Sequence, residues 1–479
     1  MTSEHWQSPL STRYASPAMQ RLWGEPHRIG CWRRVWLALA ESEHELGIAI
    51  PPAALEAMRA HLDDADLERA ANFERRFRHD VMAHVHAFGE QVPEARAYLH
   101  LGATSAFVTD NADLMVIRHA LRLVLGRVLD VMGTLRRFAT THAALPCLAY
   151  THFQPAQLTT VGKRATLWMQ DFALDVEALV HRLETLRLRG CKGTTGTQAS
   201  FLELFDGEHA KVRRLEQLIA TRLGVPSVYA VTGQTYPRKA DAQVLDLLSG
   251  IAQSAAKFAT DLRLLQHEGE LLEPFESEQI GSSAMAYKRN PMRAERIGAL
   301  ARHVISLQAN GAHTAAAQWL ERTLDDSANR RLSLPEAFLA VDAILLLAAN
   351  IAGGLEVREG VIARHVEEQM PFMATERWLM LGVQAGGDRQ ALHEVVRVHA
   401  HAVHAAVAAG GRNDLMERLG ADAAFASIDR NLLRAELDPA RYTGRAREQV
   451  AEFLDEYLDP LAARAASWAD AAEPAEVRV

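Results

Sequence analysis

Three long apolar stripes constrain the fold of this chain more than any other feature of its sequence. In each stripe, apolar residues recur at alternating spacings of three and four, which places them along one face of a helix. No helix can bury such a face by itself, so the sequence predicts a bundle of long helices, and such bundles commonly also pack between subunits. The stripes are Leu114, Ile117, Leu121, Val124, Val128, Val131 and Leu135; Phe172, Val176, Leu179, Leu183 and Leu186; and Val244, Leu247, Ile251, Ala255, Phe258, Leu262 and Leu265.

The predicted fold class is all-α, with three helical domains of which the central one is the long-helix bundle. A chain of 479 residues is too long for one core, and we expect domains at 1–104, 105–357 and 358–479. Little of the sequence alternates with period two, so no major sheet is expected. Further helices are expected over 29–46, 67–88 and 293–307, whereas two prolines favour an extended or turn-like segment over 8–17.

Composition argues against several classes of partner. The formal net charge of -8 disfavours nucleic acid, which needs clustered basic surface. Only three cysteines are present, far apart, and the polar stretch 1–6 has no signal-peptide core, so we expect a cytoplasmic protein. The most apolar run, 337–349, is too short to span a bilayer and is interpreted as a buried helix, so no membrane partner is expected.

The loops between the stripes carry polar side chains suited to an anionic ligand. The segment 281–292 reads GSSAMAYKRNPM, in which small and hydroxylated residues precede a lysine and the start of a helix. The segment 321–331 presents Arg322, Ser327 and Arg331, which suit a phosphate group. His79 stands beside Asp80, a pair that is more often structural than catalytic. A Gly-Ser-Ser turn alone would suit an ordinary surface loop, and 321–331 alone a solvated, salt-bridged helix start, but the full string 281–292 is more specific.

Seven such motifs in one order resemble those of the adenylosuccinate lyases, a family of the fumarase/aspartase superfamily, and most closely its animal-type branch. They lie at 78–84, 100–105, 151–157, 192–200, 233–236, 281–292 and 321–331. The resemblance covers almost the whole chain. It implies elimination of fumarate from adenylosuccinate to leave AMP, and the matching cleavage of the succinylated aminoimidazole carboxamide ribotide (SAICAR) to AICAR. It also implies a homotetramer in which each active site collects segments from three subunits, a small-molecule nucleotide substrate, and no metal or organic cofactor.

The resemblance also assigns roles to particular residues. Ser282 corresponds to the base that removes the proton, and cations with backbone N–H groups would have to favour its alkoxide. Lys288 would supply that charge and, with Asn290, hold the fumarate carboxylates. His152 corresponds to the general acid at the purine nitrogen, and His79 would support it or bind phosphate.

The remaining residues that the resemblance implicates would bind substrate. The succinyl part is assigned to Thr104, Ser105, Thr151 and Gln234. The nucleotide phosphate is assigned to Arg13, Tyr14, Arg322, Ser327 and Arg331, with Arg296 nearby. Arg78 and Asp80, on either side of His79, complete the expected substrate contacts.

One departure from the family pattern keeps alternatives open. The family usually has proline where this chain has Ala286, and alanine leaves the loop freer by about 0.4–1 kcal/mol. A related lyase acting on another succinyl-amine, such as argininosuccinate, is therefore a second hypothesis, although Arg322 and Arg331 favour a phosphorylated substrate. A non-enzymatic helical scaffold is a third, which would need neither Ser282 nor His152.

Overall fold

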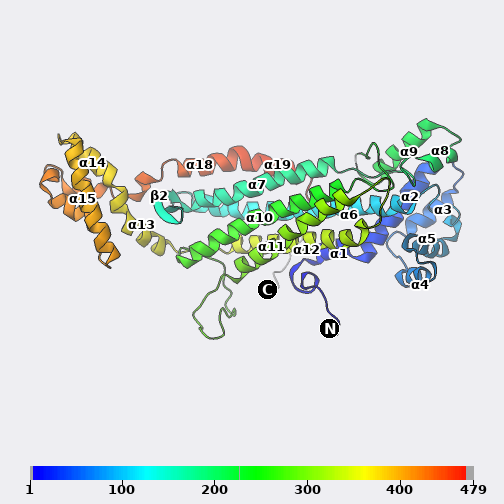
Figure 1. The fold of residues 1–479 in the computed structure, drawn as a ribbon, viewed down its shortest axis with the longest axis horizontal. Coiled ribbons are helices and arrows are strands. Elements are labelled where there is room, and N and C mark those ends of the chain that lie inside the picture. The colour runs from blue at the N-terminus through cyan, green and yellow to red at the C-terminus, as the bar shows by residue number, and fades with distance from the viewer. Residues whose placement is uncertain (1–3, 226, 471–479) are drawn as a thin grey trace.

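Helices dominate the protein, as the elongated ribbon shows (Figure 1). The computed structural model describes residues 4–225 and 227–470, so residues 1–3 of the polar N-terminal stretch lie outside it. The predicted all-α class is confirmed. The strands of the described residues form two small antiparallel pairs: β1 (Pro146–Thr151) with β2 (Gln154–Thr160), and β3 (Leu271–Leu272) with β4 (Glu356–Val357).

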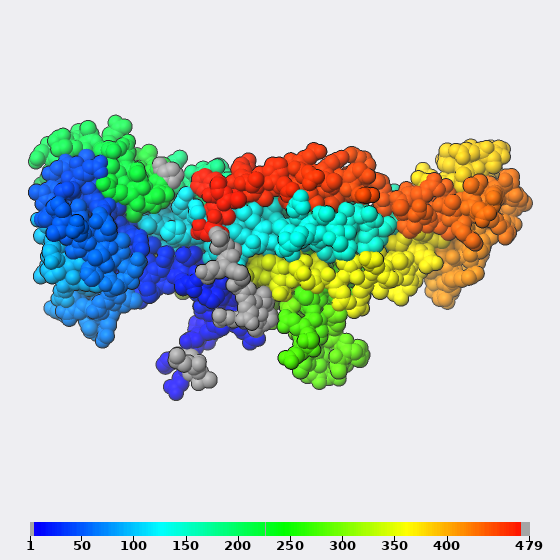
Figure 2. Space-filling view, turned by 180° about the vertical axis from the view of Figure 1, so that it is seen from behind, coloured from blue at the N-terminus to red at the C-terminus, as the bar shows by residue number. Residues whose placement is uncertain are grey.

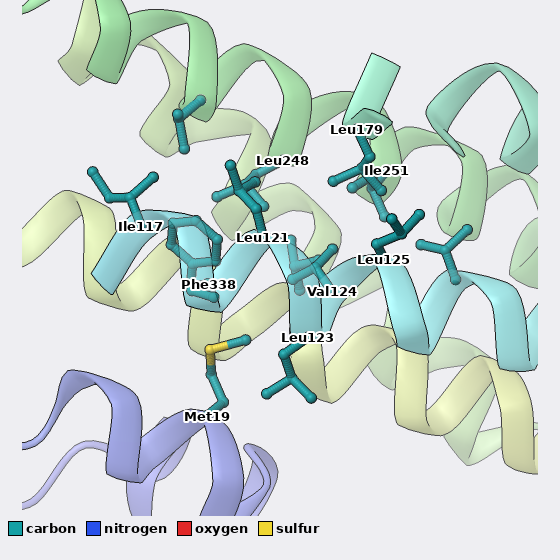
Figure 3. Packing of buried hydrophobic residues seen from close by; sticks show 14 of the residues in the cluster. Met19, Ile117, Leu121, Leu123, Val124, Leu125, Leu179, Leu248, Ile251 and Phe338 are labelled. Carbon is teal, nitrogen blue, oxygen red and sulfur yellow. The ribbon is translucent and has the colours of Figure 1, made fainter. Parts of the chain in front are cut away.

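Five long helices pack side by side as the predicted bundle. They are α6 (Ser105–Thr141), α7 (Val161–Thr185), α10 (Lys239–His267), α11 (Met292–Ala317) and α12 (Asp326–Gly353). Every residue of the first predicted stripe is buried, and Figure 3 shows Leu121 and Val124 of α6 among Leu248 of α10 and Phe338 of α12. Leu247 is the exception in the third stripe, since it is only partly buried.

The helix α12 packs against α6, α10 and α11 in this bundle. Among the described residues it is the one helix long and apolar enough, by length and composition alone, to cross a membrane. Its most apolar window is 78% buried inside the protein, as the core helix of a bundle would be. The interpretation of residues 337–349 as buried is confirmed, although the helix that contains them is longer than that run.

The N-terminal region corrects two sequence predictions. Residues 10–14 form a π-helix, η1 (Leu10–Tyr14), so the extended segment predicted there is wrong; its two prolines lie just outside η1. The single helix predicted over 67–88 is also wrong, because Arg78 takes a left-handed conformation (φ 53°) and divides it in two. The elements here are α1 (Pro17–Trp23), α2 (Glu25–Glu45), α3 (Pro52–Ala60), α4 (Leu67–Phe77), α5 (Asp80–Gln91) and η2 (Pro93–Ala95).

The C-terminal region has a small core of its own and then returns to the bundle. Residues between 374 and 433 form a separate apolar cluster, whereas α18 (Ala446–Glu452) and α19 (Asp459–Ala466) pack against α6 and α7 (Figure 2, red against the cyan α6). The three domain ranges remain a prediction. The remaining elements are α8 (Ala199–Leu204), α9 (His209–Arg222), α13 (Glu359–Met373), α14 (Thr375–Gln384), α15 (Arg389–Ala408), α16 (Leu415–Ala421), η3 (Ala423–Phe425), α17 (Arg430–Ala435), η4 (Pro439–Tyr442), α18 (Ala446–Glu452), η5 (Phe453–Leu458) and α19 (Asp459–Ala466).

A buried carboxyl group on α2 makes the stability of the fold depend on pH. Glu43 is fully buried, neither of its oxygens has a hydrogen-bond partner among the described residues, and burial raises its pKa to about 9. The folded state therefore holds a proton that the unfolded chain releases near pH 4.5. Stability from this group is complete below that pH and is lost as the pH rises towards 9.

We expect the Glu43→Gln substitution to remove this dependence. Between pH 5.5 and pH 8 the parent should lose up to about 3 kcal/mol of unfolding free energy relative to the variant. Urea denaturation at the two pH values measures the difference, with the exposed Glu68→Gln as control. Equal pH slopes for the parent and Glu43→Gln would contradict the assignment.

Candidate active site

A cavity of about 960 Å³ lies where α6 begins, at the end of the bundle next to α2 and α5. Side chains from five separate stretches of sequence line it. Nine of the residues predicted for the site are among them: Arg78, His79, Asp80, Thr104, Ser105, Gln234, Arg322, Ser327 and Arg331. The fold thus gathers nine of the seventeen predicted residues into one polar cavity.

The break between α4 and α5 is what directs His79 into this cavity. With Arg78 left-handed, His79 becomes the N-cap residue of α5, and its Nδ1 accepts a hydrogen bond from the Met82 amide (3.3 Å). Its Nε2 then lies 3.3 Å from the Ser105 hydroxyl, while its Nδ1 is 3.8 Å from the Asp80 carboxylate. The cap therefore fixes one ring nitrogen and presents the other to the cavity.

The start of α6 supplies an anion-binding end to the same cavity. Thr104 is the N-cap residue of this 37-residue helix and makes no side-chain cap bond among the described residues. The unsatisfied backbone N–H groups of the first turn and the positive end of the helix dipole favour a negative ligand group here. The hydroxyls of Thr104 and Ser105 stand beside those groups.

A buried network of ion pairs underlies the arginines of the cavity. Arg238 donates to Asp326 (2.6 Å) and to Asp110 (3.2 Å), and Arg322 donates to the other oxygen of Asp326 (2.9 Å). Arg330 is also engaged in a buried ion pair, because it donates to Asp241 at 2.6 Å. Arg322 is therefore held in place, whereas Arg331 contacts Asp80 (3.3 Å) and stays largely exposed.

The electrostatics of this network act differently on two of its carboxyl groups. Burial pushes the pKa of Asp326 upwards, but Arg238, Arg322 and Arg330 outweigh burial and leave that pKa below its ordinary value. For Asp113, burial dominates over the nearby Arg330 and raises the pKa. Sequence reasoning missed this network. Its one available signal was the set of aspartates on otherwise apolar helix faces, which need partners when buried.

Two further predicted groups lie outside the cavity. The Arg296 guanidinium sits over the Tyr14 ring, 5.8 Å from its centroid, and burial together with the neighbouring Arg13 lowers the pKa of Arg296. Thr151 and His152 lie at the exposed tip of the β1–β2 hairpin, where His152 and Phe153 both have left-handed backbones (φ 53° and 57°). Sequence reasoning gave residues 151–157 only as a motif and missed the hairpin.

The loop that precedes α11 forms the fourth group and projects from the bundle in both views (Figures 1 and 2, green). Within it the Ser282 hydroxyl accepts hydrogen bonds from the amides of Met285 (3.1 Å) and Ala284 (3.4 Å). The Asn290 side chain donates to the Gly281 carbonyl (2.7 Å), which closes the loop at its base. Lys288 is exposed. Amides directed at an oxygen are what an alkoxide would need.

One chain cannot bring these groups together. The helix α6 has 37 residues, so Ser105 at its start lies about 55 Å from the end that joins the hairpin. The helix α11 has 26 residues, which puts about 39 Å between the loop of Ser282 and the segment of Arg322. Figure 1 shows the hairpin, the loop and α5 spread along the molecule in this way. A site that uses all of them has to draw on more than one chain.

Among the described residues, no group of three or more histidine, cysteine, aspartate or glutamate side chains is arranged to hold a metal ion. The expectation of a reaction without metal or organic cofactor stays a prediction. The cavity offers instead guanidinium, imidazole, hydroxyl and amide groups, which suit a polyanionic organic ligand.

Comparison with known proteins points in one direction. A family model described as "Lyase" matches residues 19–306, and one described as "Adenylosuccinate lyase C-terminus" matches residues 371–453. The adenylosuccinate lyase of Saccharomyces cerevisiae is 50% identical over 455 residues, covering 94% of each chain. That of Schizosaccharomyces pombe is 47% identical over 94% of each chain, and that of Schistosoma mansoni is 46% identical over 95% of this chain and 96% of its own.

Solved structures agree on the fold. The 3-carboxy-cis,cis-muconate lactonizing enzyme of Pseudomonas putida superposes with a TM-score of 0.80 at 24% identity, covering 97% of this chain and all of its own. A fumarate lyase from Mesorhizobium sp. BNC1 superposes with a TM-score of 0.77, also at 24% identity, over 94% of this chain and 98% of its own. At such identities the likeness concerns the fold alone.

Proposed function

The chain belongs to the adenylosuccinate lyase family of the fumarase/aspartase superfamily, and we infer that it eliminates fumarate from adenylosuccinate to leave AMP. The same elimination from SAICAR would give AICAR, so both steps fall in purine biosynthesis. The observation that carries this function is the 50% identity to a curated adenylosuccinate lyase over 94% of both chains. We place the enzyme in the cytoplasm, in keeping with its three buried, unpaired cysteines.

The reaction needs a base on one side of the substrate and an acid on the other. A proton leaves the carbon next to a carboxylate and gives a doubly charged aci-carboxylate, while the purine nitrogen must be protonated as it departs. We assign the role of base to Ser282 and the role of acid to His152. The Ser282 oxygen already accepts hydrogen bonds from two backbone amides of its loop. Lys288 contributes positive charge and, with Asn290, binds the fumarate carboxylates.

The cavity binds the rest of the substrate in this proposal. Thr104, Ser105 and Gln234, with Thr151 of another chain, orient the succinyl group, and His79 lies 3.3 Å from Ser105 to support the acid or contact phosphate. Arg322, Ser327 and Arg331 hold the nucleotide phosphate. Arg13 and Tyr14 assist them, with Arg296 nearby.

Because the groups are far apart in one chain, we propose a homotetramer whose sites combine segments of three subunits. The separation of the hairpin, the loop and the cavity along α6 and α11 supports this assembly. The bundle also leaves apolar side chains uncovered in the single chain, as a further interface would require. They include Leu167 and Leu174 on α7, Leu264 on α10 and Leu332 on α12.

The direct test is cleavage of adenylosuccinate by the purified protein, followed by absorbance, with fumarate and AMP quantified separately. The proposal predicts that the two products appear in equal amounts. A folded oligomer that released no fumarate would contradict it. That result would direct attention to Ala286, which is exposed in the loop, and to a different succinyl-amine substrate.

We expect the double substitution Arg322→Ala and Arg331→Ala to lower kcat/KM for adenylosuccinate by about 10²–10⁴-fold. Each arginine would lose a charge-assisted bond to phosphate, worth about 1.5–3 kcal/mol. Folding should persist, because Asp326 keeps its ion pair with Arg238. The surface substitution Arg397→Ala, in α15, serves as control. Unchanged kinetics in the double variant would remove the phosphate role.

A further inference from the structure

The hairpin that carries His152 is anchored through Leu148 and Tyr150 of β1, and its tip is exposed. Residues 151–157 are exposed, and the two tip residues have strained left-handed backbones between the paired strands. The ladder is also irregular between Leu148 and Tyr150. The direction in which His152 points therefore depends on how residues 148–150 are anchored.

A single buried carboxylate provides that anchor. Glu270, fully buried between α10 and β3, accepts a hydrogen bond from the Tyr150 hydroxyl at Oε1 (3.3 Å). His365 of α13 contacts the same oxygen through Nδ1 (2.9 Å). The Arg164 guanidinium lies 3.8 Å from the other oxygen and donates to the Leu148 carbonyl. Glu270 thus reaches the hairpin at two points, directly and through Arg164.

The chemistry of this cluster makes it suited to holding a position. Burial and the neighbouring Glu270 raise the pKa of Tyr150, so its hydroxyl stays protonated and keeps donating. The Tyr150 ring also lies beside the Arg164 guanidinium (6.0 Å) and the Phe153 ring (5.8 Å), which couples the anchored strand β1 to the hairpin tip. Glu270 Oε2 and Arg164 Nη1 make no hydrogen bond among the described residues, so their 3.8 Å ion pair acts together with the hydrogen bonds from Tyr150 to Glu270 and from Arg164 to Leu148 to hold the cluster.

We propose that Glu270 and Tyr150 are positioning residues that orient the β1–β2 hairpin, and with it His152, for protonation of the leaving nitrogen. This inference rests on the proposed function. Neither residue lines the cavity that gathers the predicted substrate contacts, so both act through the hairpin. Groups that hold a catalytic side chain in its productive geometry affect turnover more than ground-state binding.

A double-mutant cycle between Tyr150→Phe and His152→Ala tests the proposal. Tyr150→Phe removes one hydroxyl, keeps the ring, and should lower kcat for adenylosuccinate about tenfold while KM changes less than about twofold. In the His152→Ala background, with enough enzyme to measure the residual rate, the same change should lower kcat less than about twofold, because no imidazole remains to be oriented. Glu270→Gln, which keeps an oxygen for Tyr150, should retain more of kcat than Glu270→Ala.

The control is Tyr457→Phe, which removes another tyrosine–glutamate hydrogen bond, from Tyr457 to Glu177. Glu177 lies 16 residues into α7, about 24 Å from the hairpin end of that helix, and parent kinetics are expected. A parent-like kcat for Tyr150→Phe would overturn the proposal, as would an equal loss in both backgrounds. Parent-like turnover by His152→Ala would instead show that the assignment of the acid had failed.

Discussion

Replacing Ser282 with alanine is expected to lower kcat for adenylosuccinate by about 10³-fold without disturbing the fold. The substitution removes the oxygen that would take the proton. Among the described residues, the Ser282 hydroxyl accepts hydrogen bonds from Ala284 and Met285 of its own loop, so little structural support is lost. Steady-state kinetics and circular dichroism of the purified variant measure the two effects.

The neighbouring Ser283→Ala substitution is the matched control. Ser283 is an exposed residue of the same loop, and its loss should leave kcat within about threefold of the parent. Parent-like turnover by Ser282→Ala, or a larger loss at Ser283 than at Ser282, would reject Ser282 as the base.

Replacing His152 with alanine is the second change expected to have a large effect, with kcat lowered by about 10²–10⁴-fold. The leaving nitrogen would then depart without a proton donor, while KM would change little. Because His152 is exposed at the hairpin tip, its removal should not lower the melting temperature. Kinetics and thermal unfolding check both statements, with the exposed His401→Ala on α15 as control. A kcat equal to that of the parent would show that another group donates the proton.

The bundle could be predicted because helix periodicity and burial are local properties of a sequence. Spacings of three and four put Leu114 through Leu135 on one face, and that face is buried as expected. The points where helices end and strands form were harder to predict. Nothing in the composition of residues 67–88 excludes a continuous helix, and the division appears only because Arg78 adopts a left-handed conformation before the His79 cap. Likewise the hairpin strands, Pro146–Thr151 and Gln154–Thr160, include proline and polar residues that weaken a strand pattern.

Within the candidate site too, some features could be predicted from the sequence and others could not. The motifs that supply ligand-facing groups are short and contiguous, so their residue types could be interpreted from the sequence. The ion pairs and hydrogen bonds that hold these groups in place link residues far apart in the sequence. Arg238 binds both Asp110 and Asp326, and Glu270 contacts Tyr150 and His365, which are about 120 and 95 residues away from it. Such pairings depend on tertiary packing. The proposed distribution of the site over several chains depends on assembly; the resemblance implies it, and the lengths of α6 and α11 support it.

The measurement that tests the account most directly is intersubunit complementation with adenylosuccinate as substrate. His79→Ala and His152→Ala proteins, carrying different affinity tags, would be mixed under conditions that exchange subunits, and hybrids isolated through both tags. His79 lines the cavity, whereas His152 lies at the far end of α6, so a shared site takes the two residues from different chains. With equal numbers of the two variants, the chance that a site receives both an intact His79 and an intact His152 is about one quarter. The account therefore predicts that hybrids regain up to about one quarter of the parent turnover. Hybrids as inactive as the separate variants would contradict a site shared between chains.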